Sequence, residues 1–243
     1  MRSLVADPAA GPRRLRRVWL IARVKALAGA SGATVDIWVH REARIGRRVR
    51  ITIESGTSTT VRVDRWSVVE DDVWLHLAGG QLLVGPDCRI SRRASIKVGG
   101  DIRLDGGNMI GYGSVVHCGD AVTMRTWAIC AEHCTIADST HRHRGPDDGI
   151  FHLVEFAPVE LGPQSFLAPR VSVGPGTTVG AFTVVGPNST VGRDLPAGVF
   201  ASGVPAVVVR ALPLDFDATA AVVQPIDPTA AAPPRPHPPI PAF

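Results

Sequence analysis

Aliphatic residues recur every six positions in the segment that begins at Leu161. This segment divides into six consecutive hexapeptides, LGPQSF, LAPRVS, VGPGTT, VGAFTV, VGPNST and VGRDLP, and each of them begins with Leu or Val. The second position is Gly or Ala in all six hexapeptides, and the fifth is mostly small or β-branched. A helical period of 3.6 would spread the aliphatic residues over every face, so the pattern excludes a helix here.

The period of six predicts an all-β fold, a left-handed parallel β-helix in which three hexapeptides form one triangular coil. The first position of each hexapeptide then points to the axis. Coils stack about 4.8 Å apart, so equivalent aliphatic side chains form ladders inside the prism. Gly or Ala at the second position suits a tight corner, where a larger side chain would crowd the turn.

The same ladder continues upstream with interruptions. Its members, six residues apart within each run, are Val84, Ile90, Ile96 and Ile102, then Ile110, Val116 and Val122, then Cys130 and Ile136. Each interruption is a two-residue insertion, which we expect to form a bulge or small loop at a corner. We therefore expect the β-helix domain to span residues 34–210.

Three segments do not follow the ladder. Residues 1–33 form a basic N-terminal segment with a helix expected over about 12–29, which could cap the domain or make weak contact with a membrane surface. Residues 139–158 form an external loop, and loops of this length in a compact fold are often functional. Residues 211–243 form a Pro-rich tail that cannot join a ladder and is expected to be disordered.

Composition and charge narrow the function further. The formal net charge of +4 is concentrated in the first 25 residues, so we expect no nucleic-acid groove. No apolar run is long enough to span a membrane, and Arg23 and Lys25 interrupt the only candidate leader, so we expect a cytoplasmic protein. We expect no metal at the four cysteines, since none has the CxxC spacing: Cys88, Cys118, Cys130 and Cys134.

Four motifs follow one another in the second half of the chain. They are Ile136-Ala-Asp138-Ser-Thr-His141, Pro158-Val159-Glu-Leu161-Gly162, Gly192-Arg193-Asp194-Leu-Pro196, and Gly203-Val-Pro205-Ala206 with Arg210. In order and spacing they resemble the hexapeptide-repeat acyltransferases, in the branch of the maltose and galactoside O-acetyltransferases and the surface-polysaccharide O-acetyltransferases. The resemblance is strong over about 130–210, moderate over 84–129 and absent in both tails.

The resemblance implies a homotrimer with active sites in clefts between neighbouring prisms. It also implies acetyl-CoA or another acyl-CoA as co-substrate, lying along the coils, and a small-molecule or saccharide acceptor. The catalytic base that it implies is a single histidine, which by position is His141; His143 is the alternative. An unperturbed imidazole has a pKa of about 6.5, which suits proton removal from a hydroxyl at neutral pH. Asp138 would either orient this imidazole or bond backbone N–H groups of its own corner.

The residues implied to contact acyl-CoA are Ala168, Pro169, Pro187, Arg193 and Arg210. The two arginines match basic residues of the family near the nucleotide end and the phosphates. The sequence departs from the family where Phe166-Leu167-Ala168-Pro169 replaces Trp-Ile-Gly-Ala/Ser and Gly186-Pro187-Asn188-Ser189 replaces Gly-Ala-Gly-Ser. Neither proline has the N–H that the family directs at the thioester and pantetheine arm, so the N–H of Ala168 or a water would have to substitute.

Several functions remain open at this point. O-acetyl transfer to a sugar hydroxyl is the first, and N-acyl transfer to an amino sugar is a close variant. The two prolines motivate a third, a catalytically inactive scaffold. A γ-type carbonic anhydrase on the same fold would need three histidines that converge on a metal, and nothing places the candidates together: His117, His133, His141 and His143.

Overall fold

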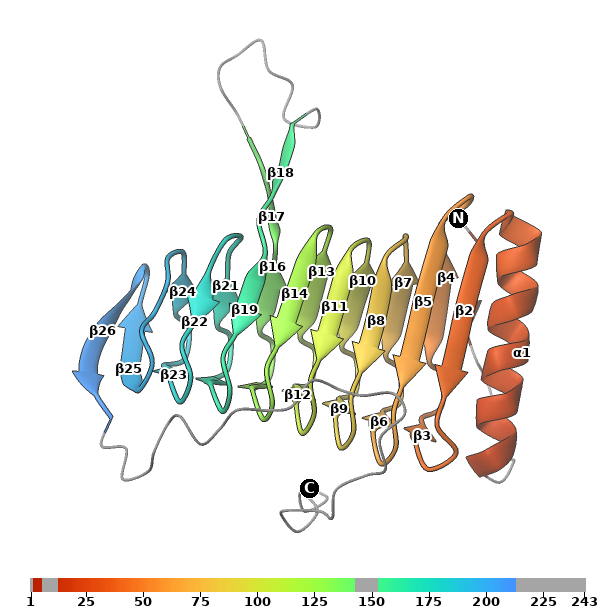
Figure 1. The fold of residues 1–243 in the computed structure, drawn as a ribbon, viewed down its shortest axis with the longest axis horizontal. Coiled ribbons are helices and arrows are strands. Elements are labelled where there is room, and N and C mark those ends of the chain that lie inside the picture. The colour runs from red at the N-terminus through yellow and green to blue at the C-terminus, as the bar shows by residue number, and fades with distance from the viewer. Residues whose placement is uncertain (1, 6–12, 143–152, 213–243) are drawn as a thin grey trace.

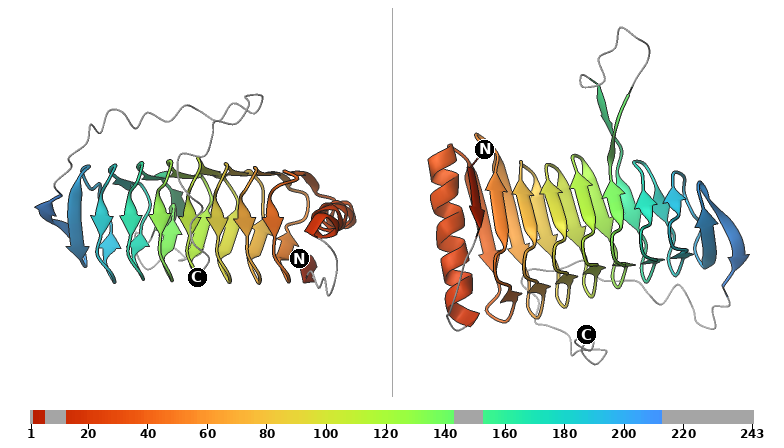
Figure 2. Two further views of the ribbon diagram at one scale, coloured as in Figure 1. Left: turned by 90° about the horizontal axis from the view of Figure 1, so that it is seen from below. Right: turned by 180° about the vertical axis from the view of Figure 1, so that it is seen from behind.

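The computed structural model describes residues 2–5, 13–142 and 153–212, which form a parallel β-solenoid with one helix (Figures 1 and 2). Three sheets form the three sides of the prism, and we call them faces 1, 2 and 3. Neighbouring strands pair in parallel along each face, except that β1 pairs antiparallel with β4 and β26 antiparallel with β25.

Face 1 consists of β1 (Arg2–Val5), β4 (Arg50–Ile53), β7 (Trp74–Leu77), β10 (Ser95–Val98), β13 (Val115–Cys118), β16 (Thr135–Ala137), β21 (Ser172–Val173) and β24 (Thr190–Val191). Face 2 consists of β2 (Thr34–Val39), β5 (Ser58–Val63), β8 (Gln81–Val84), β11 (Asp101–Leu104), β14 (Ala121–Met124), β19 (Val159–Leu161) and β22 (Thr178–Val179). Face 3 consists of β3 (Arg44–Ile45), β6 (Val68–Val69), β9 (Arg89–Ile90), β12 (Met109–Ile110), β15 (Ile129–Cys130), β20 (Phe166–Leu167), β23 (Val184–Val185), β25 (Val199–Gly203) and β26 (Ala206–Ala211).

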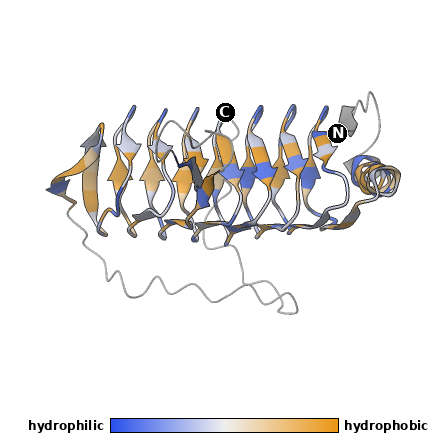
Figure 3. Ribbon diagram, turned by 90° about the horizontal axis from the view of Figure 1, so that it is seen from above, coloured by the Kyte–Doolittle hydropathy of each residue, from blue (hydrophilic) through white to orange (hydrophobic). Residues whose placement is uncertain are grey.

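The predicted aliphatic ladder is the core of the solenoid. Every aliphatic residue of the ladder between Val84 and Val191 is buried, with an exposed fraction of 3% or less. Outward and inward residues alternate along the strands, which Figure 3 shows as alternating hydrophilic and hydrophobic colouring. The small residues at the fifth position, such as Thr177 and Thr183, are buried as well. The period of six therefore identified the inward side chains correctly.

At some corners, the distance between coils requires glycine at the second position. A Cβ built on Gly111 would lie 2.2 Å from the carbonyl oxygen of Ala131, and one on Gly180 would lie 2.4 Å from the amide nitrogen of Ala197. Both contacts are with the backbone of the next coil, which cannot move away without breaking the ladder of hydrogen bonds. The sequence analysis expected a larger side chain to crowd its own turn. The structure shows that it would instead meet the backbone of the neighbouring coil.

The coils change length at the middle of the chain. Met109 pairs with Ile129, twenty residues on, whereas Phe166 pairs with Val184, eighteen residues on. The period of six predicts that the two extra residues follow Ile102. In the structure, Leu104 pairs with Met124, which in turn pairs with Leu161, so Leu104 is the residue equivalent to Leu161. The two extra residues therefore precede Leu104, at the corner between faces 1 and 2.

Helix α1 (Arg13–Ser31) covers the N-terminal end of the prism, as Figure 1 shows. Its buried residues Leu20, Val24 and Ala28 join the core and pack on the first coil. Of the part of the chain that the structure describes, no helix is long and apolar enough to span a membrane. The predicted Pro-rich tail lies outside the described residues, apart from its first two positions.

Candidate active site

The segment predicted as an external loop begins and ends as a two-stranded arm. Strands β17 (Ser139–His141) and β18 (Val154–Phe156) pair antiparallel and project from the corner between faces 1 and 2 (Figure 1). His141 pairs directly with Val154 and is exposed. Because directly paired residues lie on the same side of an antiparallel pair, His141 shares its side of the arm with the exposed Val154 and Phe156.

Neighbouring coils hold the base of this arm. The Phe156 ring lies against Gly119, where an added Cβ would be 2.1 Å from the ring. The N–H of Ala157 donates to the carbonyl of Asp138 at 2.8 Å, and the N–H of Gly176 donates to the carbonyl of Ala157 at 3.0 Å. The arm therefore leaves the prism at a defined place and presents His141 away from the solenoid wall.

Asp138 is fully buried at the base of the arm. Its carboxylate accepts hydrogen bonds from the N–H of Gly119 at 2.9 Å and from the N–H of Asp120 at 2.7 Å. The structure shows a corner role that differs from the predicted one: the carboxylate accepts from backbone donors of the preceding coil, and not from those of its own turn. The same contacts hold the corner on which Phe156 packs.

Replacing Asp138 by Ala should destabilise the protein more than it impairs chemistry. Two backbone N–H groups would lose their acceptor, and at about 1 kcal/mol for each hydrogen bond this costs about 2 kcal/mol together. Urea unfolding measures this loss, with Asp120→Ala as the control, because the Asp120 side chain is exposed at the same corner. Unchanged stability with a large loss of turnover would contradict the corner role.

Arg193 lies on the same edge of the prism as the arm. The corner between faces 1 and 2 is formed by Asp138 and the arm in one coil, by residues 174–177 in the next and by residues 192–194 in the one after. Two coil spacings correspond to about 10 Å along the axis. Arg193 is exposed there, and the neighbouring Asp194 carboxylate accepts from the N–H of Thr178 at 2.7 Å.

The other implied acyl-CoA contacts lie elsewhere. Ala168, Pro169 and Pro187 are at the corner between faces 3 and 1, and both prolines are exposed. The N–H of Ala168 donates to the carbonyl of Val185 at 2.9 Å, so the ladder already uses the donor proposed as a substitute for the missing ones. Arg210 is exposed on β26, with its guanidinium 5.6 Å from the Phe200 ring centroid. Within one chain, the width of face 1 thus separates His141 from Ala168, Pro169 and Pro187.

A row of basic side chains on face 1 was not found from the sequence. The register places His76 beside Lys97 and Lys97 beside His117, on the adjacent strands β7, β10 and β13. Burial, followed by the charge of Lys97, lowers the pKa of both imidazoles below its usual value. Spacings of 21 and 20 residues along the chain are the signal that would have revealed the row.

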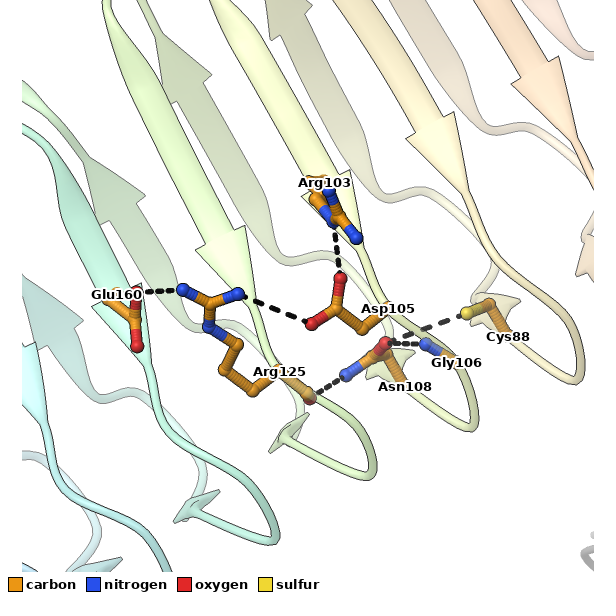
Figure 4. A network of polar contacts seen from close by, with 7 residues as sticks. All are labelled: Cys88, Arg103, Asp105, Gly106, Asn108, Arg125 and Glu160. Carbon is orange, nitrogen blue, oxygen red and sulfur yellow. Dashed lines mark hydrogen bonds and ion pairs between the residues drawn. The ribbon is translucent and has the colours of Figure 1, made fainter. Parts of the chain in front are cut away.

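A second polar network lies near the corner between faces 2 and 3 and runs from coil to coil along the solenoid (Figure 4). The nearly buried Asp105 carboxylate contacts Arg103 and Arg125, and Arg125 donates to Glu160 at 2.7 Å. The hydrogen bond with Glu160 is the main cause that raises the pKa of Arg125. Because these residues come from three successive coils, the network ties the coils together and leaves no open anion site.

The candidate histidines that the structure describes lie at three separate places. His117 lies on face 1, His133 at the corner between faces 3 and 1, and His141 on the arm. Among the residues that the structure describes, no group of three or more His, Cys, Asp or Glu side chains is arranged to hold a metal ion. The four cysteines are buried and free.

The chain matches no protein-family model, and a search of curated proteins finds no match. Solved structures do resemble it. A mutant of AntD, an N-acyltransferase from Bacillus cereus, in complex with dTDP-4-amino-4,6-dideoxyglucose and coenzyme A, is 14% identical over 79% of this chain and 89% of that one, with a TM-score of 0.43. The polySia-specific acetyltransferase NeuO is 16% identical over 78% and 88%, with a TM-score of 0.47. A maltose O-acetyltransferase from Clostridium difficile 630 is 14% identical over 86% and 81%, with a TM-score of 0.44.

Proposed function

We propose that this chain is an acyl-CoA-dependent acyltransferase that transfers an acetyl group to a hydroxyl of a saccharide, with His141 as the general base. One observation carries the proposal. The motif that ends in His141 places this imidazole, exposed, on an arm whose base is tied to two neighbouring coils. A base that is accessible but held in position is what proton transfer from an acceptor hydroxyl requires.

The separation of the site residues supports a site shared between copies of the chain. His141 and Arg193 lie at one edge of face 1, whereas Pro169 and Pro187 lie at its other edge. In a homotrimer of parallel prisms, the arm of one copy would reach the opposite edge of its neighbour and close a cleft between the two prisms. The exposed Val154 and Phe156 on the His141 side of the arm are suited to burial against that neighbour.

The chemistry needs few groups. Neutral His141 takes the proton of the acceptor hydroxyl while the oxygen attacks the thioester carbonyl carbon. The tetrahedral oxyanion then collapses, the carbon–sulfur bond breaks, and the CoA thiolate leaves and takes the proton from the imidazolium. Since the corner at Pro169 and Pro187 offers no proline N–H, a donor to the oxyanion must come from another backbone group or a water.

A thiol-release assay tests the proposal and separates its alternatives. The protein is given acetyl-CoA with a panel of neutral sugars, amino sugars and acidic saccharides, and products are identified by mass spectrometry. We expect acceptor-dependent thiol release and an alkali-labile ester. An alkali-stable amide would assign N-acyl transfer to an amino sugar. No release with any acceptor, from protein that also fails to bind acetyl-CoA, would favour the inactive scaffold.

A further inference from the structure

The basic row on face 1 consists of His76, Lys97 and His117, with Thr52 next to His76 on the adjacent strand β4. Paired residues on adjacent parallel strands are about 4.8 Å apart, so the three basic groups form a continuous line. Lys97 and His117 are exposed, and the His76 side chain is 17% exposed. The outward side of face 1 thus carries a line of nitrogen donors.

Hydrogen bonds through a buried hydroxyl orient His76, the first member of the row. The indole N–H of Trp74, which can only donate, bonds Thr52 Oγ1 at 3.0 Å, and Thr52 Oγ1 lies 2.8 Å from His76 Nδ1. Thr52 is fully buried, and His76 is the remaining described partner of its hydroxyl. The hydroxyl proton is therefore donated to Nδ1, which leaves the proton of neutral His76 on Nε2.

Lys97 lies at the centre of the row, between the two histidines. It forms no ion pair or hydrogen bond with any residue in the part of the chain that the structure describes. Lys97 is one of two lysines in a chain with many arginines; the other, Lys25, is exposed on α1. Two carboxylates act on the imidazoles of the row: Asp138, which bonds backbone N–H groups, and Glu54, whose Oε2 is 3.9 Å from His76 Nε2.

We propose that the row of His76, Lys97 and His117 binds a phosphate or carboxylate group of a ligand. Three donors in line around one unpaired ammonium fit an oxyanion. The row also leads to the base of the arm: His117 pairs with Ala137, and His141 follows four residues later. The assignment of the row as a substrate subsite rests on the proposed function. The assignment of the row as an anion site does not depend on it.

The charges around the row determine its pH dependence. Lys97 and burial disfavour the protonated imidazoles in the free protein, while Glu54 favours that form at His76 and Asp138 favours it at His117. A bound oxyanion adds negative charge beside both rings and raises their pKa values. Protons are therefore taken up on binding, and affinity rises as the pH falls through the histidine range.

Sulfate is the probe, because it stays a dianion over this range, and the readout is NMR of ¹³C-labelled histidine in the full chain. Saturable shifts of His76 and His117, but not of His133, are expected, with tighter binding at pH 6 than at pH 8. Lys97→Met should weaken sulfate binding about tenfold, and Lys25→Met should leave it unchanged. His117→Gln is the second variant and should weaken binding and flatten its pH dependence. Equal affinity in the Lys97 and Lys25 variants, or shifts that do not saturate, would overturn the proposal.

Competition against sulfate then identifies the ligand. Displacement by CoA but not by acetyl-pantetheine would assign the row to the phosphates of the acyl donor. Displacement by glucuronic acid but not by glucose would assign it to an acidic acceptor. Displacement by none of these compounds would contradict a ligand subsite. Because sulfate binding needs no acyl transfer, the anion site can stand even if the enzyme assay fails.

Discussion

His141→Ala should lower the rate of thiol release from acetyl-CoA by a factor of about 10²–10⁴, the usual contribution of a positioned general base. The loss should appear in kcat, because the proton is transferred only in the chemical step. His141 is exposed on the arm, so the substitution creates no cavity in the core and should leave the melting temperature unchanged. Steady-state kinetics with a fixed acceptor measures the effect.

Two matched variants make this test specific. His133→Ala removes an exposed histidine from a corner of the prism and should leave the rate unchanged. His143→Ala tests the alternative base two residues on, which lies outside the described residues. If His143→Ala lowers the rate as expected for the base and His141→Ala does not, the two assignments must be exchanged. If neither does, proton removal belongs to another group.

Leu82→Ala should cost about 2–5 kcal/mol of the free energy of unfolding, whereas Leu83→Ala should cost less than about 1 kcal/mol. The two leucines are adjacent on β8, but Leu82 is fully buried in the prism and Leu83 faces outward between Arg62 and Arg103. The same chemical change therefore removes core packing at one position and surface contacts at the other. Urea unfolding of both variants measures the difference, and equal losses would contradict the inward side of the strand.

Much of the fold could be predicted because one periodic pattern determines it. A residue such as Ile136 is buried because every sixth side chain points to the axis, and this holds for each aliphatic residue of the ladder. The position of the two extra residues in the longer coils was harder to predict. Ile102 and Leu104 both point inward, and the period alone does not show which of them continues the ladder. Only the pairing with the next coil shows that the extra residues lie before Leu104.

The candidate site was only partly predictable, because its residues come together through the stacking of coils. The motif located His141, but not the arm that carries it or the backbone donors that occupy Asp138. Ala168 was taken as a possible donor, and only the ladder shows that Val185 already accepts its N–H. The row around Lys97 was missed since its members are one coil apart, a longer spacing than the hexapeptide reveals.

The two corner prolines bear most directly on the proposed activity. Pro169 and Pro187 are exposed one coil apart at the same corner, so an acyl-CoA along that edge would meet ring carbons and carbonyls in place of amide donors. Such a surface still suits the apolar part of a pantetheine arm. Arg193 and Arg210 are exposed as well. Under the proposed function, the prolines would change how the thioester is held, while the two arginines would stay accessible to the phosphates.

Calorimetric titration of the full chain with acetyl-CoA tests whether the protein is an acyl-CoA-dependent enzyme without requiring knowledge of the acceptor. We expect saturable binding with a dissociation constant of about 1 μM to 1 mM, the range in which enzymes commonly hold their substrates. His141→Ala should bind acetyl-CoA as the unaltered chain does, because the base acts on the acceptor. No saturable heat up to millimolar acetyl-CoA, from folded protein, would contradict the assignment as an acyl-CoA-dependent enzyme.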